Sequence, residues 1–173
     1  KKQNNMGMIA NYQFITDEQL NALKNFKNNS EELLEEAEEW GEQTEILLDI
    51  DKMWDVLHFV LTGVDSSNPI PNNPLSEAVV GVQAIENISE FVAYTEKARI
   101  ADVLSALEAF DMDQALSHFS MEACKKAELY PDIWDYDDEK DEIIEEIADY
   151  FESMKDFYRE VLAAKGSVMV TIC

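Results

Sequence analysis

The chain contains few residues that interrupt or cross-link secondary structure. Its 173 residues include only 5 Gly, 4 Pro and 2 Cys, while 46% are hydrophobic. This composition predicts a compact and mostly helical domain. Because Cys124 and Cys173 are far apart and form no CxxC motif, we predict neither a disulfide nor a metal site, and we expect a reduced, cytoplasmic protein.

Long apolar runs are also missing. No run reaches the roughly 18 apolar residues that a membrane-spanning helix needs, and no segment resembles a signal peptide. We therefore predict no association with a membrane. Residues 1–5 are set aside as the remnant of a tag or an alternative start, and residues 6–173 are expected to form a single domain.

Basic residues are scarce. The chain has 13 Lys and Arg against 37 Asp and Glu, which gives a formal net charge of −24 at pH 7. A surface of this charge repels nucleic acids and anionic lipids and attracts basic molecules. We therefore predict a basic protein partner and no direct binding of nucleic acid.

Motifs of familiar enzyme sites are absent from the sequence. It has no nucleophile elbow, no Gly-rich phosphate loop, no HExxH zinc motif and no cluster of His and Cys. We predict no cofactor and assign no catalytic residue by template.

The hydrophobic pattern predicts an α+β fold, a single helix-rich domain with a small sheet formed by N-terminal, middle and C-terminal strands. The strands are expected at residues 8–15, 91–95 and 167–173, with the first and last as neighbours. Helices are expected at 17–26, 31–51, 51–63, 96–110, 113–127 and 138–165, with a short helical turn or edge at 75–81. Thr16 and Thr95 are the predicted caps of the helices that follow them.

Residues 51–63 form the most apolar segment of this acidic chain. Apolar side chains occur on nearly all sides of the expected helix, which predicts that the helix is buried. Asp55 and His58 are three residues apart, so the carboxylate could orient the imidazole and raise its basicity for general-base chemistry. The alternative is a histidine that is held in the core with its hydrogen bonds satisfied.

Polar residues near the end of this helix complete a candidate pocket. Thr62, Asn73 and Ser76 could fold back over the helix and line a ligand site together with Trp54. Asn73 and Ser76 could instead serve only as helix caps.

Residues 31–51 carry ten acidic side chains and no Lys or Arg. Apolar residues recur at helical spacing, so one face of the expected helix is almost entirely carboxylate. Like charges one turn apart cost a few tenths of a kcal/mol each, which makes this face, with Glu35, Glu36 and Glu39 at its centre, a candidate partner-binding surface. The alternative is a solvated face without a function.

A second acidic region contains aromatic residues. Trp134 and Tyr136 lie beside Asp135, Asp137 and Asp138, and exposed aromatic anchors in an acidic field are typical of a protein interface. The alternative is that these rings pack on the long helix at 138–165. The acidic spacing here loosely follows a calcium-binding loop, but that loop needs Gly at the position of Lys140, so no metal site is predicted.

Four stretches resemble one known family. They are MGMIANY at 6–12, DKMWDVLHFVLTG at 51–63, NPLSEAVVG at 73–81 and LYPDIWD at 129–135. These stretches are similar to those of the YfbM-like family, small bacterial proteins of unknown function. The resemblance spans almost the whole chain and implies a single α+β domain with no established activity. The acidic run at 31–51 matches no pattern of that family.

These observations favour a non-catalytic acidic protein that binds a basic protein partner, for example an immunity protein that neutralises a cationic toxin. The alternative is a small-molecule-binding protein or hydrolase-like enzyme that uses Asp55 and His58. A homodimer is disfavoured by the repulsion between two such acidic surfaces, unless the contact is apolar.

Overall fold

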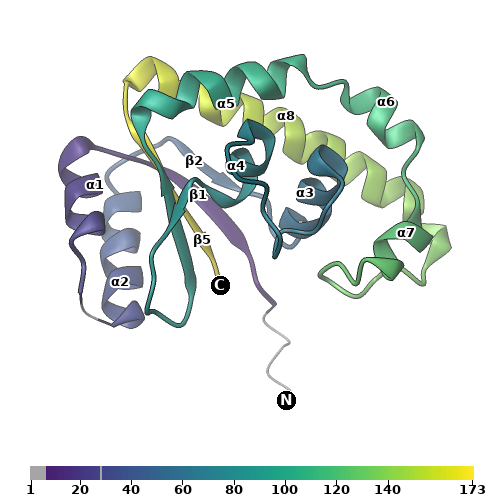
Figure 1. Ribbon diagram of the computed structural model, residues 1–173, viewed down its shortest axis with the longest axis horizontal. Helices are drawn as coiled ribbons and strands as arrows, with labels where there is room; N and C mark the ends of the chain where they lie inside the picture. The colour runs from purple at the N-terminus through teal and green to yellow at the C-terminus, as the bar shows by residue number, and fades with distance from the viewer. Residues whose placement is uncertain (1–6, 28) are drawn as a thin grey trace.

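The computed structural model describes residues 7–27 and 29–173 (Figure 1). Residues 1–5, which we set aside, lie outside this part of the chain, as do Met6 and Asn28. The described residues form one five-stranded antiparallel sheet with the order β2-β1-β5-β4-β3. Its strands are β1 (Ala10–Ile15), β2 (Leu47–Asp49), β3 (Gln83–Ala84), β4 (Phe91–Thr95) and β5 (Ser167–Ile172).

Helices account for much of the rest of the described chain. They are α1 (Asp17–Lys24), α2 (Ser30–Gly41), α3 (Trp54–Thr62), α4 (Pro74–Val80), α5 (Lys97–Ala109), α6 (Met112–Ser117), α7 (Met121–Lys126), a 3₁₀ turn (Asp137–Glu139) and α8 (Lys140–Ala164). In residues 7–27 and 29–173, no helix is both long and apolar enough to cross a membrane.

The predicted α+β architecture is confirmed, including the pairing of the two terminal strands. β1 pairs with β5 along its whole length, from Ala10 opposite Ile172 to Ile15 opposite Ser167. β4 pairs with the other edge of β5. The last strand therefore lies at the centre of the sheet, which explains why its side chains are almost all buried.

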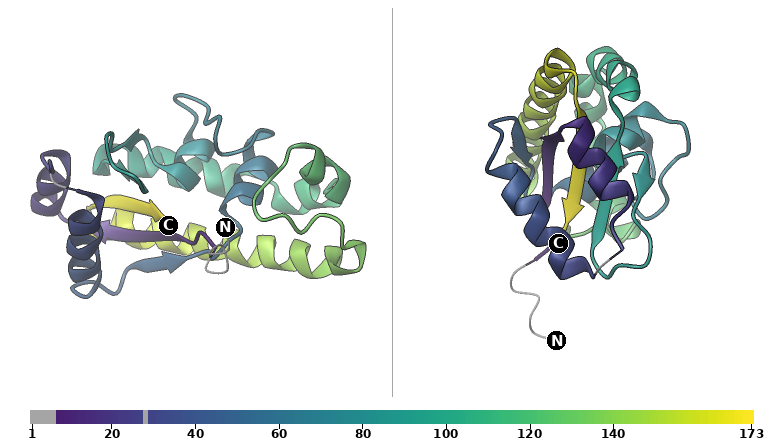
Figure 2. Two further views of the ribbon diagram at one scale, coloured as in Figure 1. Left: turned by 90° about the horizontal axis from the view of Figure 1, so that it is seen from below. Right: turned by 90° about the vertical axis from the view of Figure 1, so that its left-hand side faces the viewer.

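The two faces of the sheet support two cores. Tyr12 and Val170 face the larger core, which includes residues of α3, α4, α5 and α8. Ile15, Val92 and Met169 face the smaller core beneath α1 and α2. Figure 1 shows α1 and α2 together at one end of the molecule, while Figure 2 shows α8 extending past the other end of the sheet. Asn11 of β1 and Leu47 and Asp49 of β2 are exposed, so part of the sheet face on the side of α1 and α2 stays open.

Local hydrogen bonds explain where two of the helices begin and end. Thr16 and Gln19 form the predicted capping box at the start of α1. The end of α4 is held differently, because the buried Tyr12 hydroxyl donates to the Val79 carbonyl at 2.7 Å. The Tyr158 hydroxyl of α8 donates to the Ala78 carbonyl at 2.8 Å. Carbonyls at the end of a helix lack intrahelical partners, and these two phenols supply them.

The prediction of one helix over residues 31–51 is wrong. α2 ends at Gly41, and residues 47–49 form the edge strand β2 instead. Leu48 is buried between exposed Leu47 and exposed Asp49, an alternation with the period of a strand. Pairing with β1 stabilises this conformation, and a pairing partner distant in sequence cannot be inferred from local helix spacing.

Two other boundaries also differ from the prediction. The single helix expected at 113–127 is two short helices, because Asp111 caps α6 and Ser120 caps α7. Thr95 does not cap α5, whose N-cap residue is Glu96. Thr95 instead remains in β4, opposite Val168 of β5.

Candidate functional site

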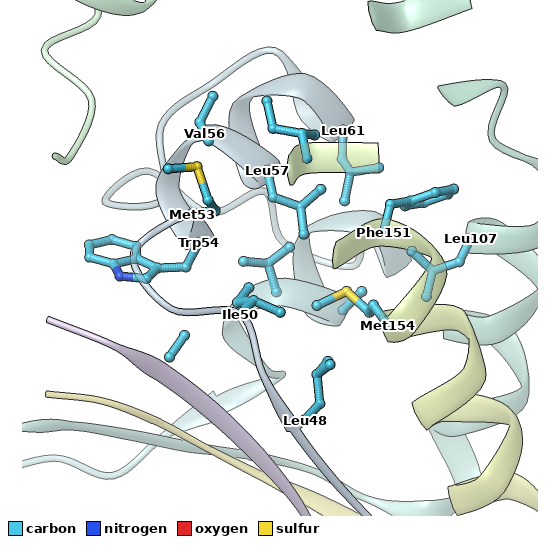
Figure 3. Packing of buried hydrophobic residues seen from close by; sticks show 14 of the residues in the cluster. Leu48, Ile50, Met53, Trp54, Val56, Leu57, Leu61, Leu107, Phe151 and Met154 are labelled. Carbon is cyan, nitrogen blue, oxygen red and sulfur yellow. The ribbon is translucent and has the colours of Figure 1, made fainter. Parts of the chain in front are cut away.

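The helix α3 is buried as its sequence predicts. Its first five residues are all less than a tenth exposed, and Gly63 ends the helix in the left-handed conformation. Figure 3 shows Leu57 and Leu61 of α3 in the same core as Leu107 of α5 and Phe151 of α8. The polar residues of α3 are thus held at fixed positions inside the larger core.

Trp54 lies at the edge of this core in a fixed orientation. Its indole ring stacks on Tyr130, with ring centroids 5.1 Å apart, and its N–H donates to the Met8 carbonyl at 2.9 Å. These contacts join α3 to the start of the sheet and to the loop after α7. The ring is therefore fixed in one orientation.

His58 is completely buried and forms hydrogen bonds at both ring nitrogens. Its Nδ1 lies 2.9 Å from the Val64 carbonyl, and its Nε2 lies 2.8 Å from the Ser76 hydroxyl. A carbonyl only accepts, so Nδ1 carries the hydrogen. The Ser76 oxygen accepts from the Ile70 amide at 3.1 Å, which leaves its own hydrogen free for Nε2 of the neutral ring.

This environment disfavours the charged form of the imidazole. Burial lowers the pKa of His58 below its ordinary value of 6.5, against smaller raising contributions from the Val64 hydrogen bond and the nearby charges of Asp55 and Asp65. Both nitrogens are already occupied, and the ring has no exposed surface. The arrangement fits a structural histidine, which is the alternative that the sequence left open.

Asp55 does not orient His58 through a hydrogen bond in the described part of the chain. Its Oδ1 accepts from the Ser66 amide at 2.9 Å and from the Ser66 hydroxyl at 2.8 Å. Its Oδ2 accepts from the Tyr130 amide at 2.8 Å. The carboxylate therefore joins two loops that are far apart in sequence, and it takes no part in a histidine pair of the kind that general-base catalysis uses.

The other predicted pocket residues have mainly structural contacts. The Thr62 hydroxyl donates to the His58 carbonyl at 2.8 Å, one helical turn earlier. Asn73 caps α4 through the amides of Leu75 and Ser76. The structure thus joins Thr62 and Ser76 to His58 by hydrogen bonds, whereas Asp55 is bonded to Ser66 and Tyr130.

Two neighbouring cavities lie beside this network. One has a volume of about 700 Å³ and is lined by Trp54 together with Val80, Phe91 and Ile172. The other has a volume of about 340 Å³ and includes Ser76 in its lining. Both are lined in part by Ser66 and Pro69 of the loop after α3 and by Val80 and Phe91, so they adjoin. Of the six predicted pocket residues, Trp54 and Ser76 reach these cavities.

The acidic face of α2 is exposed. Glu35, Glu36 and Glu39 point to solvent, while Leu33, Ala37 and Trp40 on the opposite face are buried in the smaller core. Among residues 7–27 and 29–173, no Lys or Arg forms an ion pair with any carboxylate from Glu31 to Glu45. The exposed glutamates of α2 form a carboxylate face on this shorter helix, and the function of that face stays a prediction.

The prediction that Trp134 is an exposed interface anchor is wrong. Trp134 is 3% exposed, packs edge-on against Phe119, and donates its indole N–H to the Leu129 carbonyl at 2.9 Å. Tyr136 is 55% exposed, as expected for an interface residue. Asp135 forms an ion pair with Lys125 at 2.6 Å, and Asp137 and Asp138 are exposed.

Two features were not predicted from sequence. Glu77 is buried and accepts a hydrogen bond from Arg99 at 2.6 Å, which fixes α4 to α5. A cleft of about 780 Å³ lies between α2 and the open part of the sheet, and its lining includes Glu38, Glu42 and Asp49. The alternation of residues 47–49 is the signal that could have located the floor of this cleft.

In the described residues, no group of three or more His, Cys, Asp or Glu is placed to hold a metal ion.

Comparison with known proteins gives consistent matches over nearly the whole chain. Residues 6–171 match the model of a family described as a domain of unknown function, DUF1877. The protein YfbM of Escherichia coli K12 is 29% identical over 168 residues, covering 96% of this chain and 99% of its own. The crystal structure of YfbM from Escherichia coli, a protein of unknown function, is similar with a TM-score of 0.78 and 27% identity, covering 95% of this chain and 99% of that chain.

Proposed function

Because this chain belongs to the DUF1877 family, which brings a fold but no activity, we propose a function from the geometry: it is a non-catalytic acidic protein that binds a basic protein partner. An immunity protein that neutralises a cationic toxin is one concrete form. A cytoplasmic location is part of this proposal and is supported by the two free cysteines, Cys124 and Cys173.

The observation that carries the proposal is the unpaired carboxylate face of α2. Elsewhere several of the scarce cations form ion pairs within the molecule: Lys24 pairs with Glu96, Lys97 with Asp17, and Arg159 with both Glu108 and Asp156. On α2 the described residues supply no such partner. The like charges raise the free energy of the isolated protein, and a basic partner relieves that repulsion on binding.

The polar network inside the larger core supports a non-catalytic function. His58 and Asp55 are the residues best suited to acid–base chemistry, and each is occupied by structural hydrogen bonds. A general base must reach the proton that it removes, directly or through one water molecule. The buried His58 would need the loop after α3 to open before it could do so.

A salt-dependent capture experiment tests the proposal. The protein is immobilised and exposed to lysate of the source organism at 50 mM and at 500 mM salt, and retained proteins are identified by mass spectrometry. We expect a basic partner that is retained at low salt and weakened at high salt, because screening shortens the reach of surface charge. Substitution of Glu35, Glu36 and Glu39 by Gln should reduce retention.

A matched control separates the α2 face from total charge. The variant E86Q/E122Q/E160Q removes the same three charges from exposed positions outside α2 and should retain the partner. Equal losses in the two triple variants would show that α2 is not the binding surface. Absence of any specific basic partner in either salt condition would contradict the proposed function.

A second candidate function is small-molecule binding in the cavity beside Trp54. Its volume of about 700 Å³ lies within the range of ligand sites, and its lining is mostly apolar around a fixed indole ring. Thermal-shift screening of a small-molecule library against the wild type and Val80→Trp, which fills the cavity, tests it. A compound that stabilises only the wild type would favour this function, whereas no stabilising compound would count against it.

A further inference from the structure

The sheet presents an open polar row beside α2. The strand register places Asp49, Asn11 and Thr171 side by side across β2, β1 and β5. In the next row along the strands, Leu47 lies beside Gln13, whose amide nitrogen donates to the Ala37 carbonyl of α2 at 3.0 Å. That hydrogen bond holds α2 against the sheet at the position where α2 stops covering the sheet face.

The cleft between this row and α2 has a volume of about 780 Å³. Glu38 and Glu42 line it from the helix, and Asp49 lines it from the sheet. Apolar surface is contributed by Leu34 of α2, which is half-buried, and by Leu47, which is 52% exposed. The cleft therefore combines three carboxylates with an apolar wall on two different elements.

No cation within the described residues neutralises this cleft. Its lining contains no Lys, Arg or His, and none of the ion pairs involves Glu38, Glu42 or Asp49. Asp49 accepts one hydrogen bond, from the Asp51 amide at 2.7 Å, through Oδ1. A ligand that complements this cleft is therefore a cation with an apolar part, because the cleft has both carboxylates and apolar side chains.

We propose that this cleft is where the basic partner inserts an arginine side chain, an inference that rests on the proposed function and locates its contact. The three-carbon stem of arginine packs on apolar surface of the kind that Leu34 and Leu47 supply. Its planar guanidinium has five N–H donors and binds carboxylates in pairs, which suits walls that carry Glu38 and Glu42 opposite Asp49. Asn11 and Thr171 on the cleft floor offer neutral acceptors for the remaining N–H groups.

Titration with an octa-arginine peptide tests the inference, with affinity measured by isothermal calorimetry at 50 mM salt. The cleft variant is E38Q/E42Q/D49N. The comparison variant is E35Q/E36Q/E39Q, which removes three charges from the binding face of α2 outside the cleft lining, and the control is E86Q/E122Q/E160Q. We expect the cleft variant to bind about tenfold more weakly, the α2 variant to bind about threefold more weakly, and the control to lose less than about twofold. Circular dichroism confirms that each variant is folded.

Amide chemical shifts of the labelled wild-type protein give an independent readout. On addition of the peptide, the largest changes should occur at Asn11, Leu47 and Thr171, on the floor and wall of the cleft. Equal weakening by the cleft variant and the α2 variant would overturn the cleft as the contact and leave the general acidic proposal standing. Absence of binding by the wild type would also overturn the cleft, and the salt-dependent lysate capture would then decide the proposed function separately.

Discussion

The interior around His58 and the outer face of α2 are both rich in polar groups, but they differ in whether those groups have partners. Around His58 each ring nitrogen and both oxygens of Asp55 are occupied by hydrogen bonds within the chain. On α2 the exposed glutamates have no cationic partner among the described residues. Polar groups that are satisfied inside a protein stabilise one structure, whereas unpaired surface charges remain available to another molecule.

The largest expected change in stability comes from substituting Trp134, a residue that was predicted to be exposed and lies in the core. Trp134→Ala should lower the free energy of unfolding by about 3–5 kcal/mol, because it leaves a cavity and an unpaired Leu129 carbonyl. Urea unfolding followed by circular dichroism measures this. Tyr136→Ala is the matched control at an exposed ring and should change stability by less than about 0.5 kcal/mol. Similar losses of unfolding free energy in both variants would contradict the conclusion that Trp134 is a core residue and Tyr136 a surface residue.

The next largest loss of stability is expected for substitutions of Asp55. Asp55→Ala removes the acceptor of three hydrogen bonds and strands the Ser66 and Tyr130 donors, so we expect a loss of about 3 kcal/mol. Asp55→Asn keeps the size and one oxygen acceptor, and should cost less. The same unfolding experiment measures both, and a change below about 1 kcal/mol for the Ala variant would show that water replaces the carboxylate in the loops.

The pH dependence of stability should report on His58. Burial lowers its pKa in the folded protein, so the unfolded chain binds more protons below the ordinary value of 6.5. The contribution of neutral His58 is therefore complete above about pH 6.5 and is lost as the pH falls toward the folded pKa. Thermal melts between pH 7.5 and 5.5 should show a decline in wild type that is absent in His58→Gln.

The second histidine of the chain is the control for that measurement. His118 is exposed, so His118→Gln should leave the decline unchanged. A decline that persists in His58→Gln and disappears in His118→Gln would contradict the assignment.

The smallest expected change in stability is a gain, and it comes from substitutions on α2. E35Q/E36Q/E39Q removes the three repulsive i,i+4 pairs Glu31–Glu35, Glu32–Glu36 and Glu35–Glu39 and should stabilise the protein by about 1 kcal/mol at low salt. The gain should shrink in 500 mM salt, because exposed charges are screened. Thermal melts at the two salt concentrations measure this, and destabilisation would indicate that these glutamates have a structural role in the free protein.

Sequence reasoning located the elements whose signals are local. The terminal strands, the capping box of α1 and the apolar stripe of α8 are encoded by residues close together in the chain, and each was found. β2 was missed because three residues between acidic neighbours form a strand only when β1 lies beside them. The open cleft that depends on β2 was missed for the same reason.

The candidate site shows the same division. The exposure of Glu35, Glu36 and Glu39 follows from helical periodicity and was predictable. The partners of His58 come from the loop after α3 and from α4, and the burial of Trp134 depends on Phe119 in the segment between α6 and α7. Such contacts depend on how distant segments pack together, so a single sequence indicates that a polar residue needs a partner but does not say which one.

The two oxygens of Asp55 couple the opening of two loops. The loop at residues 64–67 and the loop at residues 128–131 both rest on this one carboxylate, through the amides of Ser66 and Tyr130. If either loop opened alone, it would leave half of a buried charge without a donor, so opening together is the less costly event. Hydrogen–deuterium exchange should therefore occur at the Ser66 and Tyr130 amides with similar protection, as one cooperative unit spanning more than sixty residues of sequence.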